Sequence, residues 1–134
     1  MLSGETKVRV RYGETDKMGY CYYGNYAEFY EAARGDLLRD LGLTYREMEE
    51  MGIIMPVITM HIDYKQPAHY DDLLTVKVYV KEKPGVKIKF DYEVYNEDGK
   101  LLNSAYTTLC FVNQQTGRPG LPPKAFQELM DKYF

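Results

Sequence analysis

The sequence has no tryptophan, and its 134 residues include only two cysteines and two histidines. Two cysteines are too few for the disulfide framework of a small secreted domain or for a four-cysteine zinc site. We therefore expect a protein of the reducing cytoplasm. The pair Cys21 and Cys110 is interpreted as structural, and the isolated His61 and His69 as structural or surface residues.

Long apolar runs and a net positive charge are also lacking. The N-terminal MLSGETK contains no apolar segment of the kind found in a signal peptide, and the run Ile53–Met60 is too short to span a bilayer and contains Pro56. The formal net charge is −3, which disfavours nucleic-acid binding through bulk charge. We expect no membrane insertion and no nucleic-acid partner.

The composition is that of a globular protein. Hydrophobic residues make up 45% and charged residues 28%, so a packed core is possible and disorder is disfavoured. The length predicts a single domain over residues 1–134. Fourteen tyrosines favour sheet faces and interfaces, where the ring packs and the hydroxyl finds a partner.

The first third of the chain predicts a strand, a loop and a helix. Alternation over Thr6–Tyr12 predicts a strand that buries Val8, Val10 and Tyr12, and the loop Gly13–Gly24 follows. A helix is predicted over residues 25–41, because apolar side chains recur every three or four residues: Tyr26, Phe29, Tyr30, Ala33, Leu37 and Leu41.

Several residues mark the ends and the surroundings of this helix. Asn25 is the expected N-cap, Gly42 the expected stop, and Gly35 suggests close packing against a sheet. The pair Thr44 and Glu47 matches a capping box, which predicts a short second helix over residues 45–51.

Strand-like segments then dominate the chain until a short terminal helix. The strands are expected at Ile53–Lys65, Leu73–Lys81, Val86–Tyr95 and Leu101–Val112, and the helix at Lys124–Tyr133. Pro56 suggests a bulge or an edge position for the first of these strands. The order predicts an α+β fold, in which a five-stranded antiparallel sheet curls around one long central helix.

Few residues carry obvious chemistry, and no phosphate-binding loop, HExxH or GxSxG motif occurs. Asp16 has two interpretations. It could be a turn aspartate bonded to its own backbone, or a carboxylate beside an apolar cleft. In the second case, the free N–H groups of the segment Tyr22-Tyr23-Gly24-Asn25 could hold an oxyanion close to it.

A resemblance favours the second interpretation. The stretch RVRYGETDKMGYCYYGNYAEFYEAAR is similar to the signature of the hotdog-fold acyl-CoA thioesterases of the YbgC and 4-hydroxybenzoyl-CoA thioesterase type. The later segment DYKQPAHYDDLLTV and the pairs Arg118-Pro119 and Leu121-Pro122 also resemble this family, so the resemblance covers roughly residues 7–126. It implies a hotdog fold and hydrolysis of an acyl-CoA by water, without a metal or another cofactor.

The resemblance also implies roles for individual residues. Asp16 stands at the position of the catalytic carboxylate, which acts as nucleophile or general base. Tyr23 stands where a backbone N–H polarises the thioester carbonyl. Many YbgC-type members have histidine at this position, but a backbone donor does not depend on the side chain. A side-chain role for Tyr23 and the substrate preference of YbgC are therefore not carried over.

Cations and a second subunit are expected around the substrate. Lys87, Lys89, Lys65 and Arg118 are candidates for the nucleotide phosphates, although Lys87 and Lys89 could equally form a solvated sheet face. Members of the family are commonly homodimers, often paired into tetramers, with the pocket at a subunit boundary. We expect partner residues near Asp16, supplied by the strand around residues 58–62.

Three alternatives to an acyl-CoA thioesterase remain. The chain could be a non-catalytic module that binds acyl thioesters, or its thioester could be carried by an acyl carrier protein. It could also be a hydratase or dehydratase of the same fold. Those enzymes typically need a histidine in the loop or early helix, and this chain has none before His61.

Overall fold

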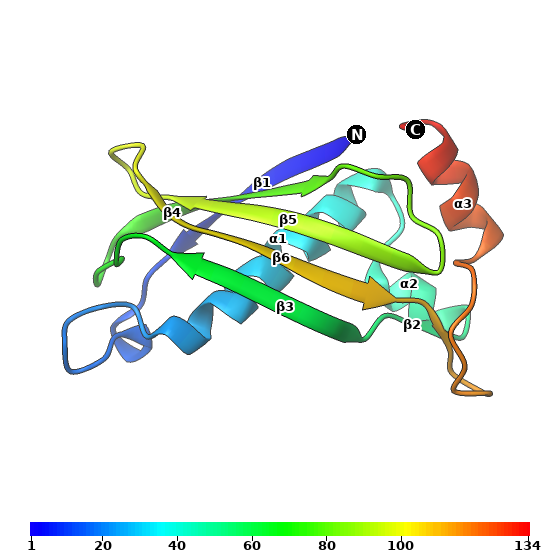
Figure 1. The fold of residues 1–134 in the computed structure, drawn as a ribbon, viewed down its shortest axis with the longest axis horizontal. Helices are drawn as coiled ribbons and strands as arrows, with labels where there is room; N and C mark the ends of the chain where they lie inside the picture. Colours follow the sequence, from blue (N-terminus) through cyan, green and yellow to red (C-terminus); the bar gives the residue numbers. More distant parts are fainter.

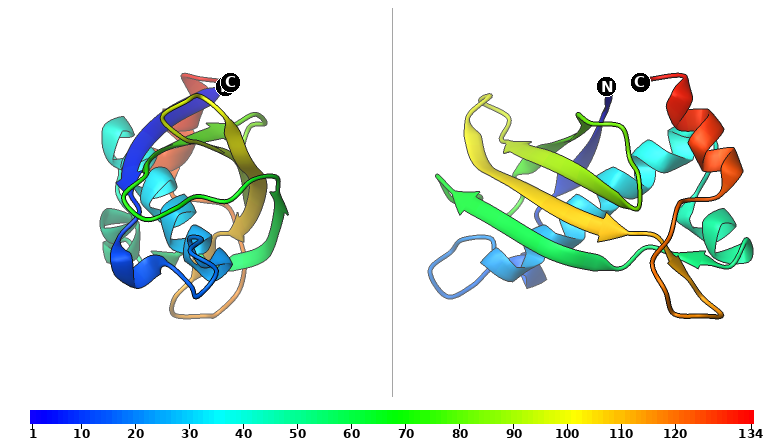
Figure 2. Two further views of the ribbon diagram at one scale, coloured as in Figure 1. Left: turned by 90° about the vertical axis from the view of Figure 1, so that its left-hand side faces the viewer. Right: turned by 45° about the vertical axis from the view of Figure 1, so that its right-hand side comes forward.

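The computed structural model describes all residues from Met1 to Phe134. A five-stranded antiparallel sheet in the order β1-β4-β5-β6-β3 curls around the long helix α1 (Figures 1 and 2). The predicted α+β hotdog arrangement is confirmed. The elements are β1 (Leu2–Arg9), α1 (Tyr26–Leu41), β3 (Val57–Tyr64), β4 (Leu73–Val80), β5 (Lys87–Tyr95) and β6 (Leu101–Cys110).

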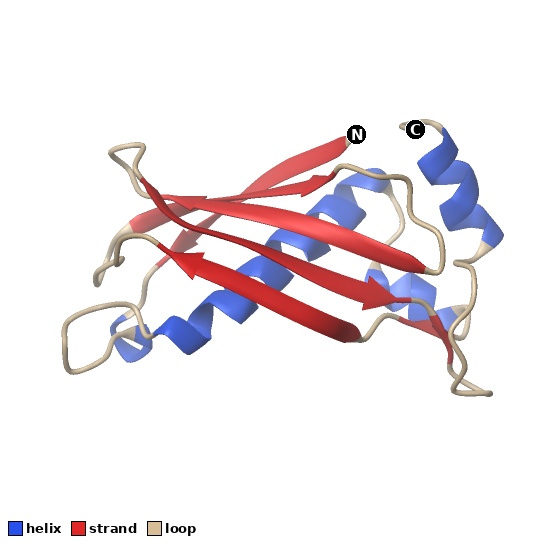
Figure 3. Ribbon diagram, viewed as in Figure 1, coloured by secondary structure: helices blue, strands red, loops and turns tan.

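Alternation along the strands builds the core between sheet and helix. The inward side chains of β4 and β5 are completely or almost completely buried: Leu74, Val76, Val78, Val80, Ile88, Phe90, Tyr92 and Val94. They face the apolar side of α1, where Tyr30 and Leu37 are buried. Burial of this apolar surface holds the helix in the concave face of the sheet (Figure 3).

The ends of α1 agree with the sequence in one case and differ in the other. Gly42 ends the helix with a φ of 89°, as predicted, because a left-handed residue closes the last turn. Asn25 is not a side-chain cap. It belongs to a 3-10 turn, η2 (Tyr23–Asn25), which leads directly into the helix, and its amide instead donates to the carbonyl of Glu14 at 2.8 Å.

The prediction for Gly35 is wrong. A Cβ atom at Gly35 would meet no heavy atom within 4 Å, so this glycine does not mark a close approach. The close approach lies at Gly4 on β1, where a Cβ would lie 3.2 Å from Cδ1 of Leu37.

Smaller elements close the end of the molecule away from the start of α1. Helix α2 (Tyr45–Glu50) has the predicted capping box between Thr44 and Glu47. Strands β2 (Ile53–Ile54) and β7 (Val112–Asn113) pair as a small second sheet, and α3 (Lys124–Asp131) follows beside it. No helix has the combination of length and apolarity that a membrane crossing requires.

The strands predicted from the sequence differ from the structure mainly at their ends. Strand β1 begins at Leu2 and ends at Arg9, and Tyr12 starts a 3-10 turn, η1 (Tyr12–Glu14), with its side chain 77% exposed instead of buried. The segment predicted over residues 53–65 is divided at Pro56. Its longer part, β3, is an edge strand with a register shift near Val57, as the proline suggested. The strand predicted over residues 101–112 is interrupted at Phe111.

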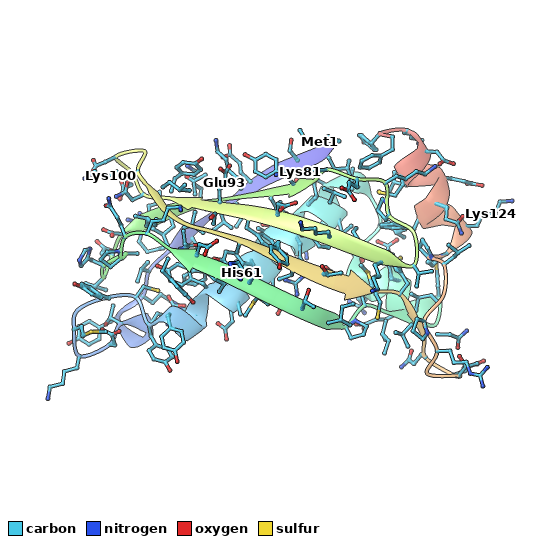
Figure 4. The ribbon with its side chains drawn as sticks, in the orientation of Figure 1. Met1, His61, Lys81, Glu93, Lys100 and Lys124 are labelled. Atoms are coloured by element: carbon cyan, nitrogen blue, oxygen red, sulfur yellow. The ribbon has the colours of Figure 1, made fainter.

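The edge strand β3 is the most open part of the sheet. Helix α1 packs more extensively against β1 and β4 than against β3. Val57, Met60 and Tyr64 lie opposite inward-facing residues of β6, yet they are 46%, 49% and 50% exposed. On the other face of β3 lies His61, which is labelled in Figure 4, and its ring stacks on that of Tyr106 of β6. Much of the inner face of β3 is thus apolar and exposed in a single chain, although Ile62 on the same face packs against the core.

Candidate functional site

The loop before α1 passes the end of β3 at the left of Figure 1. A cleft of about 250 Å³ is lined by residues from these segments. Its walls come from three segments that are distant in the sequence: the loop, the start of α1, and the end of β3 with the residues that follow it. The lining residues are Asp16, Met18, Tyr20, Cys21, Tyr23, Tyr26, Tyr64, Lys65, Gln66 and Pro67. Most of this wall is apolar or aromatic.

Asp16 uses one carboxylate oxygen to shape the loop. Its Oδ1 accepts hydrogen bonds from the backbone N–H groups of Met18 at 3.0 Å and Tyr20 at 3.2 Å. Gly19 completes this turn with a φ of 84°. The turn interpretation therefore holds for Oδ1. The second oxygen, Oδ2, has no hydrogen bond within the protein, so the half-buried side chain still offers a free acceptor at the cleft.

The turn η2 brings Tyr23 to the same cleft and leaves two backbone donors unpaired. The carbonyl of Tyr22 accepts from the N–H of Asn25, and the carbonyl of Tyr23 accepts from the N–H of Tyr26. The N–H groups of Tyr23 and Gly24 have no acceptor in the protein, as expected for the first residues of a helical turn. Such groups carry partial positive charge and can bind a developing oxyanion.

Glu14 fixes the loop in front of this turn. Its carbonyl accepts from the N–H of Tyr22 at 2.7 Å and from the side-chain amide of Asn25 at 2.8 Å. Its buried carboxylate accepts from the N–H of Arg11 at 2.8 Å. Burial alone would raise the pKa of Glu14, but the hydrogen bonds and the charge of Arg11 outweigh it and hold the pKa below its ordinary value. The loop is thus anchored by an ionised side chain.

Cys21 lies in the cleft wall but is not set up as a nucleophile. Burial, together with the negative charge of Glu14, raises the pKa of its thiol to about 11. The reactive thiolate is therefore scarce near neutral pH. This agrees with the structural role expected for Cys21, and Cys110 is likewise buried with its thiol free.

Three tyrosines surround the turn. The rings of Tyr23 and Tyr64 meet edge to face with centroids 6.3 Å apart, and those of Tyr26 and Tyr64 lie 5.9 Å apart. The hydroxyl of Tyr64 donates to the carbonyl oxygen of Tyr23 at 3.3 Å. Burial raises the pKa of Tyr26, so its hydroxyl stays protonated. Asp16 is the one carboxylate in a wall that is mostly apolar or aromatic.

The structure groups no three His, Cys, Asp or Glu side chains in a way that could hold a metal ion. Both histidines lie on the surface, as expected, with side chains 53% and 58% exposed. His61 is 3.1 Å from Asp63, and His69 is 3.8 Å from Asp72.

Comparison with known proteins identifies the family. Residues 10–130 match the family described as the thioesterase-like superfamily. YneP of Bacillus subtilis is 35% identical over 99% of this chain and 96% of its own length. The acyl-CoA thioester hydrolase YbgC of Escherichia coli is 30% identical over 88% of each chain. A crystal structure of a DHNA-CoA thioesterase from Staphylococcus aureus superposes with a TM-score of 0.94 at 34% identity, covering 99% of this chain and 91% of that one.

The chain belongs to the thioesterase-like superfamily. The resemblance read from the loop and the start of α1 is therefore confirmed at the level of the family.

The cations predicted for substrate binding in this thioesterase-like protein lie in two places. Lys65 lines the cleft. Lys87 and Lys89 are exposed on β5, and Lys87 pairs with Cys110 at the end of β6, whereas the cleft adjoins the beginning of β6. Arg118 follows β7 beside the same distant end. Within one chain, the fold brings Lys65 to Asp16 and leaves the other three away from it.

Sequence reasoning placed Asp16 and the start of α1 in one site but did not identify Tyr26 or Tyr64 as walls of the cleft. Tyr64 was within reach, because it is the second residue of the segment DYKQPAHYDDLLTV, which resembles the family. It also continues the alternation of Met60 and Ile62, which points it to the inner face of β3.

Proposed function

We propose that the protein is an acyl-CoA thioesterase, which hydrolyses a thioester to a free acid and coenzyme A. The observation that carries this proposal is the meeting of two groups at one apolar cleft: the free Oδ2 of Asp16 and the unpaired N–H of Tyr23. A carboxylate and an oxyanion donor are what hydrolysis of a thioester requires. The name of the YbgC relative supports the same substrate class.

In this mechanism, the thioester oxygen accepts a hydrogen bond from the N–H of Tyr23. The bond strengthens as negative charge develops on the oxygen, and one such donor is worth about 3–4 kcal/mol in the transition state. Asp16 then acts in one of two ways. As a general base it takes a proton from water, whose oxygen attacks the carbonyl carbon. The carbon–sulfur bond then breaks, and the proton passes from Asp16 to the departing thiolate of coenzyme A.

As a nucleophile, Asp16 attacks the carbonyl carbon itself and expels the thiolate of coenzyme A, which takes up a proton. The mixed anhydride that forms is then opened by water, which returns the free carboxylate and releases the acid. Both routes use the same oxygen, because Oδ1 is occupied by the backbone of the loop.

The acyl group is proposed to be aromatic. The rings of Tyr20, Tyr23, Tyr26 and Tyr64 line the cleft and offer faces and edges to another ring. The Staphylococcus aureus neighbour is named a DHNA-CoA thioesterase, and a curated relative from Synechococcus elongatus that is 22% identical is named a 1,4-dihydroxy-2-naphthoyl-CoA hydrolase. Dihydroxynaphthoyl-CoA therefore belongs among the first substrates to test.

A second copy of the chain is proposed to complete the site. The exposed apolar side chains of β3 and its unpaired backbone edge favour pairing with another β3, which gives a homodimer or a pair of dimers. Tyr64, the last residue of β3, would then place the cleft at the subunit boundary.

The phosphates of coenzyme A are proposed to meet Lys65 first, with Lys87, Lys89 and Arg118 as further contacts supplied across the assembly. The activity is proposed to reside in the cytoplasm, in keeping with two free, buried cysteines.

The test is thiol release from a panel of short-chain, long-chain and aryl acyl-CoAs by the unmodified protein and by Asp16→Asn. Asparagine keeps the acceptor that Met18 and Tyr20 use, so the loop should be preserved while the carboxylate is lost. We expect turnover to fall at least about 100-fold. Asp98→Asn, in the exposed turn between β5 and β6, is the matched control and should retain full activity.

Unchanged turnover in Asp16→Asn would overturn the proposed role of this residue. A protein that binds a non-hydrolysable CoA analogue without hydrolysing any member of the panel would be a binding module. Turnover restricted to thioesters on acyl carrier protein would identify a carrier-protein thioesterase, and hydration of an enoyl-CoA would identify a hydratase.

A further inference from the structure

Tyr64, the last residue of β3, contacts the turn η2 at the cleft. Its hydroxyl donates to the carbonyl oxygen of Tyr23 at 3.3 Å, and this is the one side-chain hydrogen bond that joins the sheet to the turn η2. Its ring also meets the ring of Tyr23 at an interplanar angle of 87° and that of Tyr26 at 61°. One residue of β3 thus contacts Tyr23 of the turn in two ways and the first residue of α1 in a third.

The hydrogen bond acts on a particular peptide group. The carbonyl of Tyr23 belongs to the same peptide as the N–H of Gly24, and that N–H has no acceptor in the protein. A donor bound to the carbonyl end of a peptide polarises it and makes its N–H a stronger donor. Tyr64 therefore influences Gly24, the neighbour of the N–H already assigned to the thioester oxygen.

The position of Gly24 limits what could replace it. A Cβ atom there would lie 2.8 Å from Cε2 of Tyr22, so any side chain would displace that ring. The glycine lets Tyr22 cover the turn closely while the N–H groups of residues 23 and 24 stay unpaired. The peptide between Tyr23 and Gly24 is thus bonded to the hydroxyl of Tyr64 and closely approached by the ring of Tyr22.

We infer that Tyr64 is a positioning residue: its hydroxyl orients the peptide between Tyr23 and Gly24 so that the N–H of Gly24 joins that of Tyr23 in binding the thioester oxygen. The inference rests on the proposed thioesterase function and adds a second donor to it. Tyr64 acts through the backbone of the turn and does not itself exchange protons or form bonds with the substrate.

The test compares Tyr64→Phe with the unmodified protein. Phenylalanine keeps both ring contacts and removes the hydroxyl. We expect kcat for the best acyl-CoA to fall about fivefold while KM changes less than about twofold, because the lost interaction matters most when charge develops on the oxygen. The amide nitrogen resonance of Gly24 should also shift in an NMR spectrum of the free protein.

Tyr70→Phe is the matched control. Its ring is 55% exposed and contacts Tyr12 outside the cleft, so loss of its hydroxyl should change neither kcat nor the Gly24 resonance. Both variants should unfold at the same temperature as the unmodified protein.

Three results would overturn the inference: an unchanged kcat in Tyr64→Phe, an effect confined to KM, or an unchanged Gly24 resonance. Each of these leaves the thioesterase proposal intact, since the unmodified protein still turns over and Asp16→Asn does not. If the unmodified protein releases no thiol from any substrate, the proposed function fails, and the inference fails with it.

Discussion

The hydroxyl of Tyr30 on α1 donates to the amide oxygen of Asn103 on β6 at 2.5 Å, at the centre of the fold. Both side chains are fully buried, yet the amide nitrogen of Asn103 has no partner. Exchanging the oxygen and nitrogen of the amide would move the unpaired atom without removing it. The core therefore holds a polar pair that is only half satisfied, with Tyr92 stacked on Tyr30 at 4.6 Å.

The pair Tyr30 and Asn103 predicts that substitutions at these two residues have strongly non-additive effects on the free energy of unfolding. Tyr30→Phe should destabilise the protein by about 1–3 kcal/mol, because it leaves the whole amide of Asn103 buried without a partner. Combining it with Asn103→Leu removes both polar groups, and the double variant should recover most of that loss. Urea unfolding of the two single variants and the double variant measures the cycle. Losses that simply add would show that the hydrogen bond contributes nothing specific.

Replacing Gly35, inside α1, and Gly42, directly after it, with alanine should change the stability of the protein in opposite directions. Gly35 lies inside the helix with open space around its Cβ position, so Gly35→Ala should stabilise the protein by about 0.5–1 kcal/mol. Gly42 ends the helix in the left-handed region, so Gly42→Ala should destabilise it by about 1 kcal/mol. Thermal unfolding of both variants gives the comparison. Changes of the same sign would contradict this account.

The buried faces of the strands could be predicted because alternation is a local property. In β4, every second residue from Leu74 to Val80 is buried, as the pattern requires. The start of β1 could not be found in this way. Leu2 pairs with Val80 and Gly4 with Val78, so the segment becomes a strand through a long-range partner rather than through its own apolar pattern.

The residues of the site likewise include some that are close in the sequence and one that only the sheet brings near. Asp16 and Tyr23 are seven positions apart in the sequence, so one loop and one helix start suffice to bring them together. Tyr64 lies 41 residues beyond Tyr23 and reaches it only through the place of β3 in the sheet. Asn25 was misassigned because the carbonyl of Glu14 competes for its side chain, a tertiary contact that capping preferences do not include.

The unpaired edge strand β3 predicts a dimer that a single added charge on this strand should disrupt. Met60 lies on the inner face of this strand and is 49% exposed, so Met60→Lys should oppose pairing with a second copy by adding charge to the edge. Sedimentation velocity should show the unmodified protein as a dimer or larger, and the variant shifted toward monomer. Leu121→Lys, on a 62% exposed residue outside the sheet, should not change the assembly. A monomeric unmodified protein would contradict the proposed pairing.

The ion pair between Glu14 and Arg11 predicts how stability depends on pH. The pKa of Glu14 lies below its ordinary value of 4.5, because hydrogen bonds and the charge of Arg11 outweigh burial. The carboxylate of Glu14 therefore binds a proton less readily in the folded protein than in the unfolded chain. The stability gained is complete above about pH 4.5 and is lost as the pH falls through the lower, folded-state pKa. Glu14→Gln should therefore be less stable than the unmodified protein at pH 7.

Urea unfolding at pH 7 and at pH 3 checks this sign. The difference between the unmodified protein and Glu14→Gln should narrow at pH 3, because protonation removes from Glu14 the charge that glutamine lacks. Glu49→Gln, on an exposed carboxylate of α2, is the control and should give a small difference at both values. If the difference in unfolding free energy between the unmodified protein and Glu14→Gln stays constant or widens at pH 3, the loop depends on the shape of this side chain rather than on its charge. In that case, the anchoring of the turn beside Asp16 would have to come from the carbonyl of Glu14, which accepts from Tyr22 and Asn25 at any pH.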